Sequence, residues 1–214
     1  MEKTHGYNQI KIEEKFSRLQ KIRTQIGQLG ALNLYHSMIV SHIRYGITSW
    51  CHGNSIMKTS LEKTSVNFLK MVFANNSSDY IRQKMVDHRL LSIDQLLFYE
   101  IALDMYKVHN KMSPECFTEL FTNPSHRMIT RSRSQFSSEC PRIQLTKQAM
   151  NYKGPFIWNK IPNSVKYCSS DNVTLAMQYR SLDNFKEYLK DFILNTGPSA
   201  IGFYISQILH PVEY

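Results

Sequence analysis

Apolar residues recur at spacings of three and four along most of this chain, which is the period of an amphipathic α-helix. The first such stretch, residues 8–29, places lysines and arginines on the face opposite its apolar positions. The same periodicity predicts helices at residues 32–50, 56–74, 92–111 and 181–196, with short helices ending near residue 86 and over residues 113–121. The pattern therefore predicts a mainly α protein.

Local signals mark where these helices should begin and end. Gly27 and Gly30 are expected to loosen or end the first helix. Ser92 and Ser181 are residues of the type that caps a helix N-terminus. The apolar tail, residues 198–214, is too short to span a bilayer, and we expect it to form a small docking helix or a frayed end.

The helical period is lost after about residue 122. Residues 127–136 and 142–150 are short segments rich in Thr, Ile, Gln and Ser, and the turn signal "SSECP" lies between them. We interpret residues 127–150 as a small β-hairpin. The next stretch, "NYKGPFIWNKIP" (151–162), combines Gly and Pro with aromatic residues, and its G-P-x-x-W-N sequence is interpreted as a rigid turn.

Positive charge concentrates in the same region. The whole chain carries a formal net charge of +9 and has a pI near 9.4. Residues 121–160 hold seven lysines and arginines and a single acid, Glu139, so they carry +6 of that charge. A basic segment of this density favours a polyanion as partner, and RNA or an RNA–DNA duplex is the expected one.

Two groups of candidate site residues follow from the charge and the aromatic pattern. Arginine and lysine side chains can contact a phosphate backbone, and the candidates for this role are Arg127, Arg131, Arg133, Arg142, Lys147 and Lys153, with Lys11, Lys15 and Arg18 on the first helix. The basic face of that helix is equally typical of a solvated surface. The candidates for a structural anchor are Tyr152, Gly154, Pro155, Trp158 and Pro162. Trp158 could instead stack on an unpaired base, but the anchor is the favoured interpretation.

No pattern of catalytic or metal-ligating residues emerges. The four cysteines form no C-x-x-C pair, and His36 and His42 are six residues apart, which places them on different sides of a helix. G-x-S-x-G, P-loop and H-E-x-x-H sequences are absent. The first residues lack the apolar core of a signal peptide, and no apolar run has the length of a membrane span, so we expect an intracellular protein of the nucleus or cytoplasm without a membrane partner.

Five stretches, in order, resemble one family. They are "LNLYHSMIVSHIRYGITSW" (32–50), "LLFYEIALDMYKVHNKMSPECFTELF" (96–121), "HRMITRSRSQF" (126–136), "PRIQLTKQAMNYKGPFIWNKIPNSVK" (141–166) and "SLDNFKEYLKDFIL" (181–194). Together they resemble the region that follows the polymerase palm in reverse transcriptases of non-long-terminal-repeat retrotransposons, especially the jockey-like group. The likeness covers about residues 11–194.

The resemblance implies a division of the chain and a partner. Residues 1–75 would be a helical, thumb-like domain, and residues 76–214 would be a carboxy-terminal extension with the hairpin, the G-P-x-x-W-N turn and a closing helix near 181–196. A polymerase thumb grips the template–primer duplex through its backbone, so the resemblance implies binding of RNA or an RNA–DNA duplex without sequence preference.

The departures from the family bear on activity. The family's palm carries an aromatic-Ala-Asp-Asp box that holds two metal ions for phosphoryl transfer, and this chain has no Asp-Asp pair. We therefore expect no catalytic residue, metal or cofactor here; magnesium would belong to a palm domain that, with the endonuclease domain, would lie upstream. Ile143 stands where the family has Thr after Arg142. A helical protein-interaction scaffold and a degenerate transposon product are the alternative interpretations.

The missing carboxylate pair generates a direct prediction. The purified chain should incorporate no nucleotides on a primed RNA template with Mg²⁺ or Mn²⁺, because phosphoryl transfer requires metal ions held by carboxylates. A primer-extension assay against a mock purification measures this. Template-dependent incorporation above the mock level would overturn the prediction.

Overall fold

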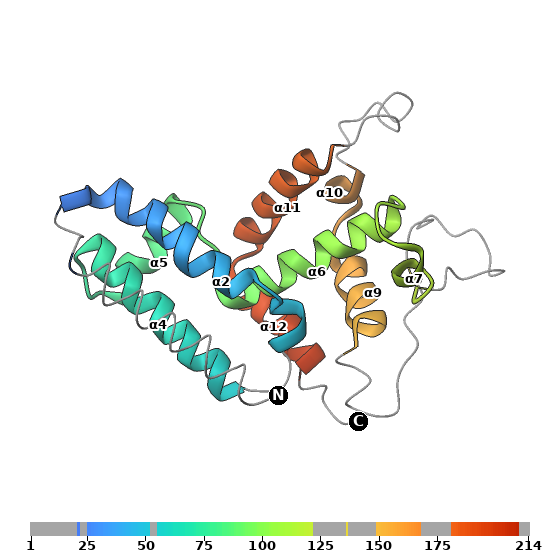
Figure 1. Cartoon of the computed structure of the whole chain (residues 1–214), viewed down its shortest axis with the longest axis horizontal. Coiled ribbons are helices and arrows are strands. Elements are labelled where there is room, and N and C mark those ends of the chain that lie inside the picture. Colours follow the sequence, from blue (N-terminus) through green and yellow to red (C-terminus); the bar gives the residue numbers. More distant parts are fainter. Residues whose placement is uncertain are drawn as a thin grey trace. The chain divides into compact units, whose positions relative to one another are not determined.

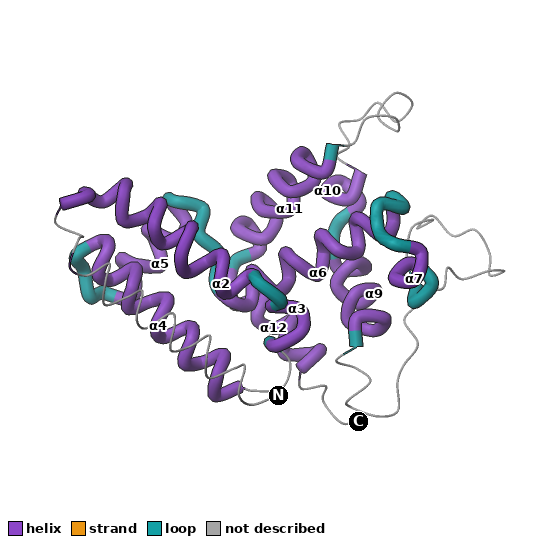
Figure 2. Tube along the Cα trace, in the orientation of Figure 1, coloured by secondary structure: helices purple, strands orange, loops and turns teal. Residues whose placement is uncertain are grey.

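The structure, a computed structural model, describes residues 21, 25–51, 55–121, 136, 149–167 and 181–209. Most of these residues are helical, and none of them forms a strand (Figures 1 and 2). The prediction of a mainly α protein is thus confirmed. Within the same ranges, every helix is too short or too polar to cross a membrane.

The chain divides into two compact units, residues 1–97 and 98–214, whereas the sequence placed the boundary after residue 75. The division falls inside α6 (Ile93–His109). The cause lies in the packing of the first unit: α5 (Ser78–Asp87) contacts α4 (Ser55–Phe73), and Asp94 in the first turn of α6 pairs with Lys58 of α4.

A long helical stretch comes first among the continuously described residues of the first unit. Residues 25–34 are helical and continue through a π-helix, η1 (Tyr35–Val40), into α2 (Ser41–Arg44). Gly30 does not end the stretch, but Gly27 has a φ of 66°, which is outside the α-helical region, so the helix is loosened at Gly27 as expected. A glycine costs a helix only about 1 kcal/mol, and Ala31 and Leu32 are buried just beyond the pair. The break comes instead at Tyr45 and Gly46, before α3 (Ile47–Trp50).

Tyr35 links the π-helix to α4. Its ring stacks on Phe68 with centroids 5.4 Å apart, and its hydroxyl is 2.7 Å from the hydroxyl of Ser65. Burial raises the pKa of Tyr35, and the Ser65 hydrogen bond opposes that rise. Ile39 and Ile43, four and eight residues further on, are also buried, so one face of the stretch forms the core of this unit.

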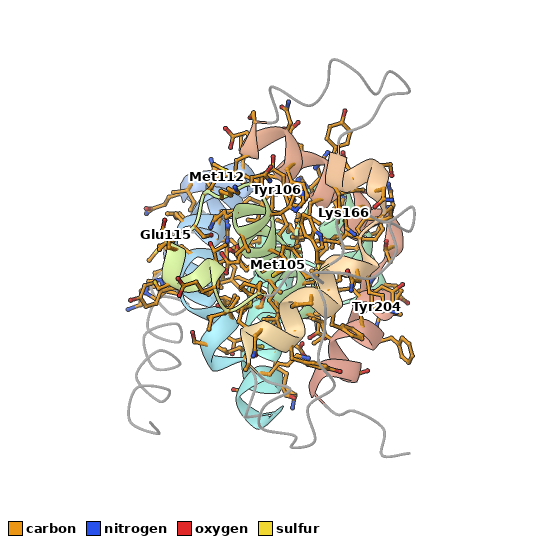
Figure 3. The ribbon with its side chains drawn as sticks, turned by 90° about the vertical axis from the view of Figure 1, so that its right-hand side faces the viewer. Met105, Tyr106, Met112, Glu115, Lys166 and Tyr204 are labelled. Carbon is orange, nitrogen blue, oxygen red and sulfur yellow. The ribbon has the colours of Figure 1, made fainter. Side chains whose placement is uncertain are left out.

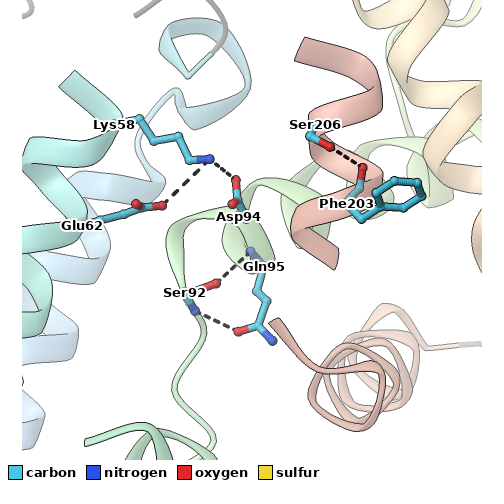
Figure 4. Close-up of polar contacts among 7 residues, drawn as sticks. All are labelled: Lys58, Glu62, Ser92, Asp94, Gln95, Phe203 and Ser206. Carbon is cyan, nitrogen blue, oxygen red and sulfur yellow. Dashed lines mark hydrogen bonds and ion pairs between the residues drawn. The ribbon is translucent and has the colours of Figure 1, made fainter. Parts of the chain in front are cut away.

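Polar contacts hold the beginning of α6 (Figure 4). The backbone N–H of Ser92 donates to Gln95 Oε1 at 2.9 Å, and the N–H of Gln95 donates to Ser92 Oγ at 3.3 Å, which is a capping box. Lys58 Nζ lies 2.5 Å from Asp94 and 3.9 Å from Glu62. Burial raises the pKa of Glu62, Lys58 lowers it, and the charge of Asp94 adds to the rise.

In the described residues, the second unit contains the rest of α6 and five further helices. These are α7 (Glu115–Thr118), α9 (Met150–Lys160), α10 (Asn163–Tyr167), α11 (Leu182–Thr196) and α12 (Pro198–Leu209). Helix α11 contacts both α10 and α12. The Asp183 N–H donates to Ser181 Oγ at 3.1 Å, so Ser181 caps α11 as predicted. Residues 198–209 of the tail form a docking helix, because Ile201 and Ile205 of α12 are buried.

Two sequence interpretations concern residues 127–162. The predicted hairpin, 127–150, lies outside the described residues except for Phe136, Ala149 and Met150, and Met150 is the first residue of α9. The G-P-x-x-W-N turn is wrong: Gly154, Pro155 and Trp158 are all inside α9.

The reason for this correction is packing at Gly154. A Cβ atom at this position would lie 2.5 Å from Met105 Sδ and 3.3 Å from Phe121 Cε1. The glycine therefore allows α9 to approach α6 closely, and Met105 itself is fully buried. Burial of the neighbouring side chains Ile157 and Trp158 further stabilises the helix.

The close approach predicts a coupled stability effect. Gly154→Ala should lower the free energy of unfolding by about 1–2 kcal/mol, because overpacking at Met105 outweighs the gain in helix propensity. In a Met105→Ala background the same change should be neutral or stabilising, since the obstructing sulfur is gone. Urea denaturation of the four proteins of this double-mutant cycle measures both effects. Equal losses in the two backgrounds would show that the close approach does not limit this position.

Candidate nucleic-acid interface

Trp158 is the centre of an aromatic cluster in the second unit. Its side chain is fully buried. Ring centroids of three neighbours surround it: His109 at 5.5 Å, Phe185 at 6.1 Å and Phe136 at 6.3 Å. Phe185 also stacks on Tyr106 at 4.1 Å. This burial is the environment of a structural anchor, and a fully buried ring cannot serve as a stacking platform for a base.

Phe136 ties the basic segment to this cluster. It is buried, and its ring lies 5.8 Å from that of Phe121 and 6.2 Å from that of His109. Its carbonyl accepts a hydrogen bond from Asn159 Nδ2 of α9 at 3.4 Å. A point of the chain three residues after Arg133 is thereby fixed in the core.

Lys166 of α10 approaches the same tryptophan. Its Nζ lies 5.3 Å from the centroid of the Trp158 ring, and its side chain is only 3% exposed. Burial lowers the pKa of Lys166 to about 8, because the charged form is poorly solvated there. Figure 3 labels Lys166 together with Met105, Tyr106 and Tyr204 of the same unit.

The structure locates some of the predicted contact residues. Arg127, Arg131, Arg133, Arg142 and Lys147, and the first-helix residues Lys11, Lys15 and Arg18, lie outside the described residues. Lys153 was wrongly placed among the contacts. It is only 2% exposed, because it lies on the buried side of α9 rather than in a loop.

The predicted anchor residues fall into three environments. Gly154 and Pro155 are buried with Trp158. Tyr152 is half-buried on the outer side of α9. Pro162 is exposed, and its carbonyl accepts the N–H groups of Val165 and Lys166, each at 3.1 Å, at the start of α10.

A second group of aromatic residues is partly exposed at the surface, and we did not recognise it as a group from the sequence. Tyr152, Phe156 and Lys160 follow one another at intervals of four along α9, and Tyr204 and Phe203 of α12 continue the group. We call these five residues the aromatic stripe. The interval of four is present in the sequence. It places side chains on one face only if the segment is helical, and we had interpreted this segment as a turn.

Neither the chemistry of the described residues nor comparison with other proteins assigns an activity. Within the described ranges, no group of three His, Cys, Asp or Glu side chains could hold a metal ion. No family model, curated protein or solved structure matches the chain. The features available for a functional argument are therefore the basic segment, its attachment at Phe136 and the aromatic stripe.

The buried lysine predicts a pH effect with a definite sign. The unfolded chain keeps the Lys166 proton up to its ordinary pKa of 10.5, whereas the folded chain loses it near 8. The burial of the charge therefore costs stability below pH 8, by up to about 3 kcal/mol, and this cost disappears as the pH rises from 8 to 10.5. Lys166→Met should raise the free energy of unfolding at pH 7 by about 1–3 kcal/mol.

Denaturation across pH 7 to 10.5 tests this. The difference in the free energy of unfolding between Lys166→Met and the unmodified chain should shrink as the pH rises above 8. Lys160→Met, which changes an exposed lysine, provides the control and should show no such trend. A constant difference across the whole series would mean that Lys166 titrates normally.

Proposed function

We propose that this chain is the region after the palm of a non-long-terminal-repeat retrotransposon reverse transcriptase of the jockey-like group. It would comprise thumb-like helices followed by a carboxy-terminal extension. In this proposal the chain is not catalytic alone and binds RNA, or the backbone of a template–primer duplex, without sequence preference. Support comes from the five ordered sequence stretches and from the net charge of +6 over residues 121–160.

The observation that carries the binding proposal is the burial of Phe136 within the basic segment. Arg131 and Arg133 precede this fixed point by five and three residues, and Arg142 follows it by six. A segment held at one point loses less conformational entropy on binding than a free one, so more of the phosphate attraction is available as affinity. Phe136 thus gives the arginines a fixed attachment to the helical core.

The chemistry of these side chains sets the expected mode of binding. Guanidinium groups form paired hydrogen bonds with phosphate oxygens. Such contacts carry affinity and position but no information about base sequence. Each neutralised phosphate releases counterions, so the affinity should fall steeply with salt.

A helical protein-interaction scaffold is the second candidate. It is favoured by two large apolar side chains next to α7 that remain exposed, Met112 at 57% and Leu120 at 53%. Apolar surface of this kind can dock a partner helix or groove. Nucleic-acid binding that depends on the arginines would separate the first candidate from this one.

The basic segment predicts a uniform loss of affinity. Arg131→Ala together with Arg133→Ala should weaken binding to RNAs of every sequence alike, by roughly tenfold or more at low salt. The slope of log affinity against log salt should flatten by about one to two units, since each phosphate contact contributes about 0.7–0.9. Fluorescence anisotropy over a salt series measures both quantities.

A charge-matched control separates local contacts from net charge. Lys63→Ala with Arg82→Ala removes the same charge from exposed positions of α4 and α5. This pair should leave the slope almost unchanged. If the two double variants weaken binding equally, or if neither does, the basic segment is not the site.

A further inference from the structure

The aromatic stripe has a regular geometry. The Tyr152 and Phe156 rings are 6.4 Å apart and inclined by only 25°. Lys160 Nζ lies 5.4 Å from the Phe156 ring and 5.5 Å from the Tyr204 ring, so its ammonium group lies between α9 and α12. The Phe203 ring is 6.4 Å from that of Tyr204. Two helices thus contribute to one row of rings and a cation.

The stripe is not part of the core. Trp158 and Phe185 are fully buried, whereas Tyr152, Phe156 and Tyr204 are only half-buried and Phe203 is 59% exposed. Aromatic side chains have enough apolar area to make such exposure costly. Aromatic rings that remain partly exposed at a surface are therefore suited to stacking against a planar partner.

The charge around the stripe indicates which planar partner fits. Helix α9 contains two lysines and no acid, of which Lys153 is buried and Lys160 is exposed, and residues 198–209 carry no charge at all. Lys160 is exposed, and its aliphatic stem can remain on the rings while its ammonium group reaches an anion. The surface therefore combines aromatic rings with one exposed cation, Lys160, which complements a base attached to a phosphate.

We infer that the aromatic stripe stacks unpaired bases of single-stranded RNA, with Lys160 contacting an adjacent phosphate. This inference rests on the proposed function and adds to it a preference for single-stranded RNA over duplex RNA. Base faces inside a duplex are covered by their neighbours, whereas unpaired bases can open onto aromatic rings. The basic segment binds any nucleic-acid backbone, so the stripe is what distinguishes single strands from duplexes.

The test uses the full chain, a dye-labelled unstructured 20-nucleotide RNA and the matching 20-base-pair RNA duplex. Phe156→Leu with Tyr204→Leu keeps both positions apolar and removes the rings. Single-strand affinity should fall about 5- to 50-fold, and duplex affinity should change less than twofold. Tyr204→Phe, which keeps a ring, should bind as the unmodified chain does. Thermal melts of each variant report on folding.

Two controls place the effect at the stripe. Tyr188→Leu removes an exposed aromatic ring from α11 and should leave both affinities unchanged. Lys160→Gln should lower the slope of log affinity against log salt for the single strand by about one unit.

A fluorescence measurement tests stacking directly. The fluorescence of one 2-aminopurine in the single strand should be quenched when the RNA binds the unmodified chain, so this test does not depend on whether a variant folds.

The outcomes separate this inference from the proposed function. If the unmodified chain binds neither RNA, the proposed function fails. If it binds both but the ring variants lose single strand and duplex equally or not at all, or 2-aminopurine is not quenched, the stripe inference alone is overturned. Loss of self-association in the ring variants with unchanged RNA affinity would also overturn it, because the stripe would then be a protein interface.

Discussion

The burial of Trp158 is the interaction on which the second unit depends. Its ring contacts His109, Phe136, Phe185 and Lys166, so one side chain of α9 joins residues from α6, α10, α11 and the basic segment. Removal of a buried tryptophan side chain costs about 3–5 kcal/mol, a large share of the stability of a small domain. The position of Phe136 and the outward face of α9 both follow from this packing.

Much of the helical architecture could be predicted from periodicity and capping chemistry. The helices at Ser55–Phe73, Ile93–His109 and Leu182–Thr196 follow clear apolar spacings, and Ser92 and Ser181 cap the helices that follow them. These helices form where predicted because their apolar faces and their capping residues favour the same boundaries. The helix continues past Gly30 because the burial of Ala31 and Leu32 outweighs the modest propensity cost of a glycine, whereas Gly27 loosens the helix with a positive φ.

The candidate site was predictable only in part, and the reason is tertiary packing. Gly154 and Pro155 indicate a turn when only neighbouring residues are considered, but the contact with Met105 makes a glycine useful inside a helix. The same error placed Lys153 at the surface and hid the four-residue spacing of Tyr152, Phe156 and Lys160. The concentration of positive charge in residues 121–160 can be read from the sequence. The burial of Phe136 against Trp158 cannot, because it depends on tertiary packing.

The most direct test of the central claim is photo-crosslinking of the full chain to RNA that contains 4-thiouridine, followed by mass spectrometry of the linked peptides. If the basic segment attached at Phe136 binds RNA, cross-linked peptides should come from residues 127–160. The number of cross-links should fall as salt rises, because the attraction depends on phosphate charge. Cross-links confined to residues 55–97, or none above a bovine albumin control, would contradict the account.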